Sequence, residues 1–391
     1  MITTEPLREG DQRQVHVLAR MAFGERSPFD ADRPRLADHE HTCVYEGDRL
    51  IASAGTIPFT QTFGGRAVPC GGVTGVMVAP DHRGYGLART VVAASLAAMR
   101  ERGQWLSALY PTTTTLYRGV GYEVAGWWET SKLPMSALPT APDRLDWSCT
   151  ELDDPAVAEV MTTMARDNEG WVAAPTVSWA RAAHIARQGE RDSDTWVGRR
   201  SGRPAAVVAL RYRDSRSAVF DLTADHLGGI DHEALVDALA FVGRHATTAD
   251  AVVTSLPRHL LATLVEHPQR ASVTDSWPWM LRIVDIPRAL ESRGWNPHVV
   301  GTIDLEVDDP LLGSDQRRWR MSWSGGRATL EPGGNGGIRL DVATLASCYA
   351  GSVDIGALAG AGRLDGIDTG SLQLLVAAGS APTPPTLPIF F

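Results

Sequence analysis

Cysteine is scarce in this sequence, and its placement argues against a metal or disulfide framework. The 391 residues include four cysteines, Cys43, Cys70, Cys149 and Cys348. They stand far apart, in no CxxC or Cys/His spacing of the kind that holds a metal. We therefore expect free thiols in a reducing compartment and no structural metal.

Long apolar runs and a basic character are also missing. The stretch TVVAASLAAM at 90–99 is too short to span a bilayer and is bounded by Arg89 and Arg100. The start, MITTEPLREGDQRQ, carries no apolar signal-peptide region. A net charge of −9 argues against nucleic acid as a partner, because phosphate binding needs a clustered basic surface. We expect a cytoplasmic protein, and its acidic charge agrees with a cationic small substrate.

Three familiar catalytic or nucleotide-binding motifs are absent. No GxxxxGK[ST] occurs, which excludes a P-loop, and no GxSxG marks the nucleophile of an α/β-hydrolase. A dinucleotide fingerprint would need a third small residue where Arg89 stands. It would also need a parallel βαβ unit, which the antiparallel strands expected before this point do not supply.

The glycine-rich segment that is present, RGYG at 83–86, follows an apolar strand and opens an amphipathic helix. A helix start offers unpaired N–H groups and the positive end of the helix dipole, so it binds anions readily. Gly84 and Gly86 allow close backbone approach, and Arg83 adds charge. By itself RGYG also fits a strand–helix turn that happens to hold two glycines. The strand before it, with Pro80 at its end, and the helix after it favour a pyrophosphate site.

The first third of the chain is expected to fold in the order α–βββ–α–β–α–β. Glycine turns at 47–48 and 64–65 separate three antiparallel strands between about 40 and 80. Apolar residues at helical spacing run from Leu87 to Met99, and Gly103 lies just beyond as a C-cap. The other expected elements are a helix at 14–23, a strand at 104–111, a short segment at 116–121 and a strand at 122–130.

A proline-punctuated linker at 131–147 precedes what looks like a second copy of the same order. Its expected elements are a helix at 153–165, a hairpin at 195–213, a strand at 217–223, a helix at 231–245, and strands at 251–256 and 279–286. Where the first copy has RGYG, this one has ADHLGGIDHE at 224–233, so we expect a fold repeat without a cofactor loop. From about 290, closely spaced strands followed by small helices suggest a compact α+β domain.

One sequence pattern resembles a known family. V-x-V-x-P-x-x-R-x-x-G-L-x-R, which starts at Val76, is similar to motif A of the Gcn5-related (GNAT) acetyltransferases. The wider chain resembles the Eis (enhanced intracellular survival) family of aminoglycoside and amine N-acetyltransferases. That likeness is carried by Ile57–Phe59, the block LYRGVGY at 116–122, WPWMLRIVDIPRAL at 277–290 and an aromatic final residue.

The resemblance implies a fold class and three domains. The fold is α+β: tandem GNAT folds, each a central mixed sheet flanked by helices, followed by a sterol-carrier-protein-like α+β domain. We expect a catalytic GNAT domain at 1–140, a second GNAT-like domain without a cofactor loop at 141–288, and the sterol-carrier-protein-like domain at 289–391. The last domain would supply a C-terminal carboxylate, and the assembly would be a homo-hexamer.

The same resemblance places an acetyl-CoA site and a catalytic pair. The implied cofactor contacts are Val76, Met77, Val78, Arg83, Gly84, Tyr85, Gly86, Leu87, Ala88, Arg89, Thr112 and Thr113. Tyr117 would protonate the leaving thiolate, and the carboxylate of Phe391 would act as base toward the amine. Taken alone, Tyr117 is as compatible with a packing role, and a free terminus is usually disordered. The prolines and apolar residues of SAPTPPTLPIFF favour an anchored one.

The substrate pocket is indicated only weakly. Glu25, Asp30 and Asp32 could form a negative pocket or a solvated loop, and Phe390 gives the penultimate position no charge. The expected function is acetyl-CoA-dependent N-acetylation of aminoglycoside-like or other polyamine small molecules, with antibiotic resistance as one physiological role. Two alternatives stay open: a biosynthetic N-acetyltransferase for one metabolite, and a non-catalytic acyl-CoA or lipid binder.

Overall fold

The computed structural model describes most of the chain as two compact units. The described residues are 1–24, 28–29, 40–140, 144–173, 193–212, 220–313, 316–380 and 383–388. Among them, unit 1 comprises 1–126 and 279–380, and unit 2 comprises 127–278 and 383–388. Unit 1 therefore combines the first and last thirds of the chain.

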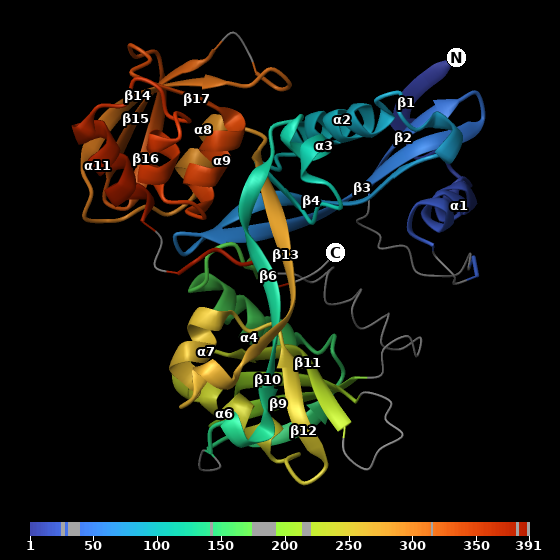
Figure 1. Cartoon of the computed structure of the whole chain (residues 1–391), viewed down its shortest axis with the longest axis vertical. Coiled ribbons are helices and arrows are strands. Elements are labelled where there is room, and N and C mark those ends of the chain that lie inside the picture. The colour runs from blue at the N-terminus through green and yellow to red at the C-terminus, as the bar shows by residue number, and fades with distance from the viewer. Residues whose placement is uncertain are drawn as a thin grey trace. The chain divides into compact units, whose positions relative to one another are not determined.

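Unit 1 is built on a sheet with the strand order β1-β2-β3-β4-β5-β13 (Figure 1). Its elements in chain order are β1 (Ile2–Pro6), α1 (Gln12–Phe23), β2 (Glu40–Glu46), β3 (Arg49–Phe63), β4 (Arg66–Val78), η1 (Pro80–His82), α2 (Leu87–Glu101), β5 (Leu106–Leu109) and α3 (Thr114–Arg118). The expected helices and strands are all present. The sequence analysis missed β1, whose five residues pair antiparallel with β2 at the edge of the sheet.

Helix α2 fixes the start of the glycine-rich loop because one of its faces is buried. Its fully buried side chains are Val91, Val92, Leu96 and Met99, and they pack in one cluster with residues of β2 and β3. Burying a Val or Leu side chain contributes roughly 1.5–3 kcal/mol, so this face holds the helix on the sheet. In Figure 1, α2 lies along β2, β3 and β4.

Strands β6 (Glu123–Pro134) and β13 (Ser272–Ile283) each contribute to both units. Met280–Ile283 of β13 pair with Leu106–Leu109 of β5 in unit 1. Ser131–Pro134 of β6 pair with Ala251–Thr254 of β12 in unit 2. The boundaries between the two units therefore fall inside these strands, at 126/127 and 278/279.

Unit 2 repeats the order of elements found in the first third of the chain. Its sheet has the strand order β13-β6-β12-β11-β10-β9-β7. The elements are β7 (Asp146–Thr150), α4 (Pro155–Arg166), β8 (Val172–Ala173), β9 (Ser193–Arg200), β10 (Arg203–Tyr212), β11 (Phe220–Gly229), α6 (His232–Gly243), β12 (Ala249–Thr254), α7 (Arg258–Leu264) and η3 (Pro268–Arg270). Of these, the sequence analysis missed β7, β8, α7 and η3.

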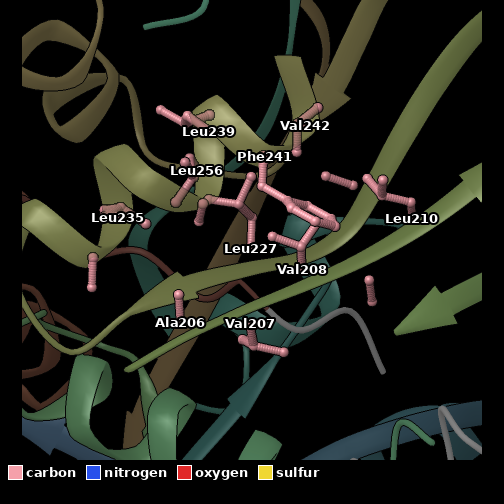
Figure 2. Packing of buried hydrophobic residues seen from close by; sticks show 14 of the residues in the cluster. Ala206, Val207, Val208, Leu210, Leu227, Leu235, Leu239, Phe241, Val242 and Leu256 are labelled. Carbon is pink, nitrogen blue, oxygen red and sulfur yellow. The ribbon is translucent and has the colours of Figure 1, made fainter. Parts of the chain in front are cut away.

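The core of unit 2 is formed by buried side chains of α4 and α6 that pack against the sheet. Figure 2 shows Phe241 of α6 beside Val208 of β10 and Leu227 of β11, all of them buried. The Trp147 ring stacks on Phe241 with the ring centroids 4.2 Å apart. The tryptophan of β7 is therefore part of the packing and needs no ligand to explain it.

Strand β11 continues through most of the segment at 224–233. The strand runs to Gly229, and α6 begins at His232, so only two residues connect them. Asp231 caps the helix by accepting a hydrogen bond from the Ala234 amide at 2.8 Å. A carboxylate thus occupies the helix start of unit 2 and already binds one of its amides.

The remaining part of unit 1 is a four-stranded sheet with helices. Its elements are α8 (Ile286–Ser292), β14 (Gly301–Asp308), β15 (Arg318–Ser324), β16 (Arg327–Pro332), β17 (Ile338–Asp341), α9 (Val342–Ala350), α10 (Ile355–Gly360) and α11 (Thr369–Gly379). The strand order is β16-β15-β14-β17. Every residue of α9 is buried, so this helix is the centre of the α+β domain that the sequence predicts.

Candidate active site

Strand β4 loses its neighbour on one side halfway along its length. It pairs with β3 from Arg66 to Val78, but with β5 only through Cys70, Gly71 and Gly72. Among the described strands, none is recorded in register with the β5-facing edge of Val73–Val78. The N–H and C=O groups on this edge can therefore form hydrogen bonds with an extended ligand.

A β-bulge lies within this open part of β4. Ser53 pairs with Met77 and Gly55 with Thr74, so Gly75 and Val76 together oppose one residue of β3. Gly75 has a φ of +58°, which a glycine adopts at little cost. Bulges bend a strand and strengthen its twist, which explains why β4 turns away from β5 here. Gly75, the second glycine of GVTGVMV, was the signal that could have predicted the bulge.

The loop at 83–86 lies between η1 and α2, with all four of its residues exposed. Gly84 and Gly86 have φ values of +87° and +79°, and a Cβ added at either would meet no atom within 4 Å. No side chain caps the N-terminus of α2. The first amides of a 15-residue helix thus face open space beside two glycines, which fits the phosphates of a bound coenzyme.

Two arginines hold and charge this loop. Arg83 donates from Nε to the carbonyl of Val78 at 3.3 Å, and so ties the loop back to the end of β4. Arg89 lies one turn into α2, and its Nη1 is 3.8 Å from the position of a Cβ built on Gly119. The loop, the open edge of β4 and the turn after α3 therefore lie in one region of unit 1.

A surface ion pair that the sequence analysis missed braces η1. Arg49 of β3 donates two hydrogen bonds to Asp81, of 2.7 and 2.9 Å, and these hold the pKa of that carboxyl well below its usual range. Both side chains are about half exposed. The pair fixes the geometry of the turn more than it stabilises the fold, since exposed ion pairs contribute little.

Tyr117 lies buried in α3, with only 5% of its surface exposed. Its ring packs edge-on against Tyr122, with the centroids 5.9 Å apart. Burial raises the pKa of Tyr117 to about 12, so the phenol keeps its proton at neutral pH. Within the described part of the chain no hydrogen bond engages its hydroxyl, which leaves that proton available to a ligand. Thr112 and Thr113 are exposed just before α3.

Tyr122 connects this turn to the point where β4 and β5 separate. Its hydroxyl lies 2.6 Å from Oγ of Ser107 on β5, and that Oγ donates to the carbonyl of Gly71 on β4 at 3.0 Å. A serine has one proton to give, so Tyr122 donates to Ser107. Sequence reasoning missed Ser107, because nothing in the spacing of 71, 107 and 122 shows that they meet.

Four residues expected in the site lie outside the described residues. They are the C-terminal Phe390 and Phe391 and the acidic Glu25 and Asp30. The preceding tail at 383–388 is held by unit 2. The Thr386 amide donates to the carbonyl of Glu169 at 2.9 Å, and Trp171 Nε1 donates to the Thr386 hydroxyl at 2.7 Å. Leu387 is fully buried.

The described residues lack both a metal-binding cluster and a helix able to cross a membrane. They hold no group of three or more His, Cys, Asp or Glu side chains that could bind a metal ion. No helix among them has both the length and the apolar character needed to cross a bilayer.

Two segments match known domain families. Residues 3–125 match the acetyltransferase (GNAT) domain, and residues 286–388 match the sterol carrier protein domain. An uncharacterized N-acetyltransferase from Streptomyces avermitilis is 25% identical over 365 residues, which cover 88% of each chain.

Solved structures agree over the whole chain. A GCN5-related N-acetyltransferase from Kribbella flavida is 26% identical with a TM-score of 0.84, covering 100% of this chain and 98% of that one. A GCN5-related N-acetyltransferase from Anabaena variabilis has a TM-score of 0.90 and is 23% identical. Eis1 from Mycobacterium abscessus has a TM-score of 0.81 and is 22% identical, and both comparisons cover 100% of each chain. The last two show the fold alone.

These findings define the class of protein. The chain is an N-acetyltransferase that contains an acetyltransferase (GNAT) domain and a C-terminal sterol carrier protein domain, and its fold is the expected α+β one of tandem GNAT sheets. Its substrates are therefore an acyl-CoA and an acceptor.

Proposed function

We propose that this enzyme transfers an acetyl group from acetyl-CoA to an amine of a cationic, polyamine-like small molecule such as an aminoglycoside. The observation that carries the proposal is the convergence of three features in unit 1. These are the open edge of β4, the uncapped start of α2 and the uncommitted hydroxyl of Tyr117. The likeness of the whole chain to the Eis family supports the substrate class.

The cofactor assignment follows the chemistry of each segment. Acetyl-CoA supplies an acyl group activated as a thioester. The backbone of Val76–Val78 would hold its extended arm, and the segment Arg83–Arg89 would hold its pyrophosphate. Thr112 and Thr113 would complete the contacts. The bulge and the two open glycines make room for this ligand.

Two proton transfers accompany the reaction, which forms a C–N bond and breaks a C–S bond. The sulfur gains a proton, and Tyr117 would donate it. Because burial raises the pKa of Tyr117 to about 12, the phenol is a weak acid and donates only as charge develops on the sulfur. The amine loses a proton, and we assign its acceptance to the carboxylate of Phe391, directly or through water.

The choice of amine depends on residues near the site. Glu25 and Asp30 would attract a cation, whereas Phe390 would add an aromatic wall. A pocket with few acids and more aromatic surface would favour a single biosynthetic metabolite instead. The Eis resemblance also leads us to propose a homo-hexamer, which light scattering of the purified protein would test.

A thiol-release assay with acetyl-CoA and a panel of amines tests the proposal. We expect turnover with aminoglycosides or linear polyamines and slower turnover with monoamines of similar size. Turnover with one biosynthetic amine alone would favour the narrower enzyme. Tight acetyl-CoA binding without turnover of any amine would support an acyl-CoA binder and overturn the transferase proposal.

A further inference from the structure

Arg282 is a fully buried arginine near the end of strand β13, between the buried residues Leu281 and Ile283. Its side chain has no exposed surface, and that of Asp309 is 5% exposed. Nη2 of Arg282 donates to both carboxylate oxygens of Asp309, at 2.7 and 2.8 Å. Asp309 follows β14 of the sterol-carrier domain, and its Oδ1 also accepts from the amides of Leu311 and Leu312. These two backbone amides orient the carboxylate of Asp309 independently of its bonds to Arg282.

The other nitrogens of Arg282 point to backbone carbonyls. Nε donates to the carbonyl of Val120 at 2.9 Å, and Nη1 donates to the carbonyl of Ile283. Val120 lies in the turn between Tyr117 and β6. A buried arginine is costly, and this one offers no surface for a ligand. We take the bond from Arg282 to Val120 as the reason for burying this arginine, because it holds the turn at 117–122 rigidly.

The turn at 117–122 is built around the carbonyl of Tyr117. That oxygen accepts from the amides of Val120 and Tyr122, at 3.0 and 3.1 Å. Gly121 has a φ of +90°, and a Cβ there would lie 2.6 Å from Nε of Arg282. The glycine is needed both for its backbone conformation and for the close approach of the guanidinium. Arg282 therefore contacts the turn itself as well as neighbouring residues.

We propose that the Arg282–Asp309 pair positions Tyr117 for proton donation. Asp309 belongs to the sterol-carrier domain, and the guanidinium of Arg282 links it to the turn at 117–122. The amides of that turn bind the Tyr117 carbonyl. The side chain of Tyr122 anchors the same turn from the sheet, so the phenol of Tyr117 is fixed from two sides. This inference rests on the proposed role of Tyr117, and Arg282 itself is a positioning residue that touches no substrate.

Arg282→Lys in the full-length protein tests the proposal. A lysine keeps the charge beside Asp309 but cannot also replace the Nε–H bond to Val120. We expect kcat to fall about tenfold to a hundredfold. KM for acetyl-CoA should stay within about threefold, because the coenzyme contacts are untouched. Asp309→Asn, which leaves the arginine in place, should lower kcat in the same direction and serves if the lysine variant does not fold.

A double-mutant cycle with Tyr117→Phe separates positioning from general destabilisation. If Arg282 acts through Tyr117, then Arg282→Lys should cause little further loss of kcat in the Tyr117→Phe enzyme. Additive losses would overturn the inference, as would a wild-type kcat in folded Arg282→Lys and Asp309→Asn. A wild-type kcat in Tyr117→Phe would overturn the proposed donor and this inference together, and so is distinguishable from failure of the inference alone.

Arg293→Lys is the matched control. Arg293 is also buried, lies in the same unit and donates to backbone carbonyls, those of Gly294 and Tyr349. Its guanidinium lies over the Trp295 ring, 4.3 Å from the centroid. A loss of thermal stability with unchanged kcat is expected. An equal loss of kcat in this control would show that any buried arginine matters, and would overturn the specific role of Arg282.

Discussion

The phenol of Tyr117 combines burial with a hydroxyl that has no hydrogen-bond partner among the described residues. Other buried phenols of unit 1 have partners: the Tyr122 hydroxyl contacts Ser107, and the Tyr45 hydroxyl accepts from the Arg8 amide. Tyr117 packs by its ring, so its hydroxyl adds little to the fold. A residue of this kind can be altered without large structural loss, which makes the proposed donor testable.

Tyr117→Phe should lower kcat about a hundredfold or more, the usual contribution of a positioned proton donor. KM for acetyl-CoA and the melting temperature should change little, because the ring and its contact with Tyr122 remain. Steady-state kinetics by thiol release and a thermal melt check both. An unchanged kcat would remove Tyr117 from the reaction.

The pH profile offers a second check on the same residue. Since the pKa of Tyr117 is raised to about 12, the donor stays protonated far above neutrality. The wild-type kcat should therefore show no fall between pH 8 and 10 that depends on Tyr117. A fall in kcat near pH 10 that disappears in Tyr117→Phe would mean that burial does not raise the pKa of Tyr117.

At the scale of elements, α2 is where the sequence was most informative. Its helical period, the strand before it and the two glycines between them predicted the loop and its anion site, and the structure gives the same element boundaries to within two residues. The bulge in β4 and the short β4–β5 pairing were not predicted. Gly75 was a local signal for the bulge, but the length of the β4–β5 pairing depends on how the strands twist against one another, which no local pattern encodes.

Gly86→Ala tests the loop at the start of α2. Alanine is strained at a φ of +79°, and its methyl group would enter the open space where we propose that a phosphate binds the helix amides. We expect KM for acetyl-CoA to rise about tenfold and stability to fall by about 1 kcal/mol. Gly103→Ala is the matched control, since Gly103 follows the other end of α2 with a φ of +73° and open space. It should lose similar stability without a change in KM.

The tail at 383–388 is the second informative element. Thr386→Val keeps the shape of the side chain but removes the oxygen that accepts from Trp171 Nε1. We expect faster amide hydrogen exchange at Thr386 and Leu387, and a lower kcat because Phe391 follows Pro388 by only three residues. Thr263→Val, an exposed position on α7, is the control. Unchanged exchange in Thr386→Val would show that this bond does not hold the tail.

At the scale of the whole molecule, buried phenols make the fold sensitive to alkali. Burial raises the pKa of both Tyr45 and Tyr117 to about 12 and that of Tyr122 still higher. Each phenol ionises near pH 10 in the unfolded chain and at a higher pH in the folded protein. Their contribution to stability is therefore complete below pH 10 and is lost as the pH rises toward 12.

Urea unfolding at pH 8, 10 and 11 measures this effect. The free energy of unfolding should fall steeply above pH 10, by up to about 2–3 kcal/mol for each phenol at full ionisation. Tyr122→Phe should flatten the fall, although it will also lower stability at pH 8 because Ser107 loses its partner. An equal slope in wild type and variant would contradict the assignment to Tyr122.

The sequence by itself determined the local elements and the chemical class of the enzyme. Periodicity, glycine turns and the segment from Val76 to Arg89 are local signals, because helix faces, tight turns and anion-binding loops depend on residues near in sequence. Tertiary structure decided everything that joins distant segments. It set the sharing of β6 and β13 between two units, the Ser107–Tyr122 contact and the buried bond from Arg282 to the turn of Tyr117. These depend on strand pairing across more than a hundred residues, or on which side chains a closed core brings together, and neither is written in any short stretch of sequence.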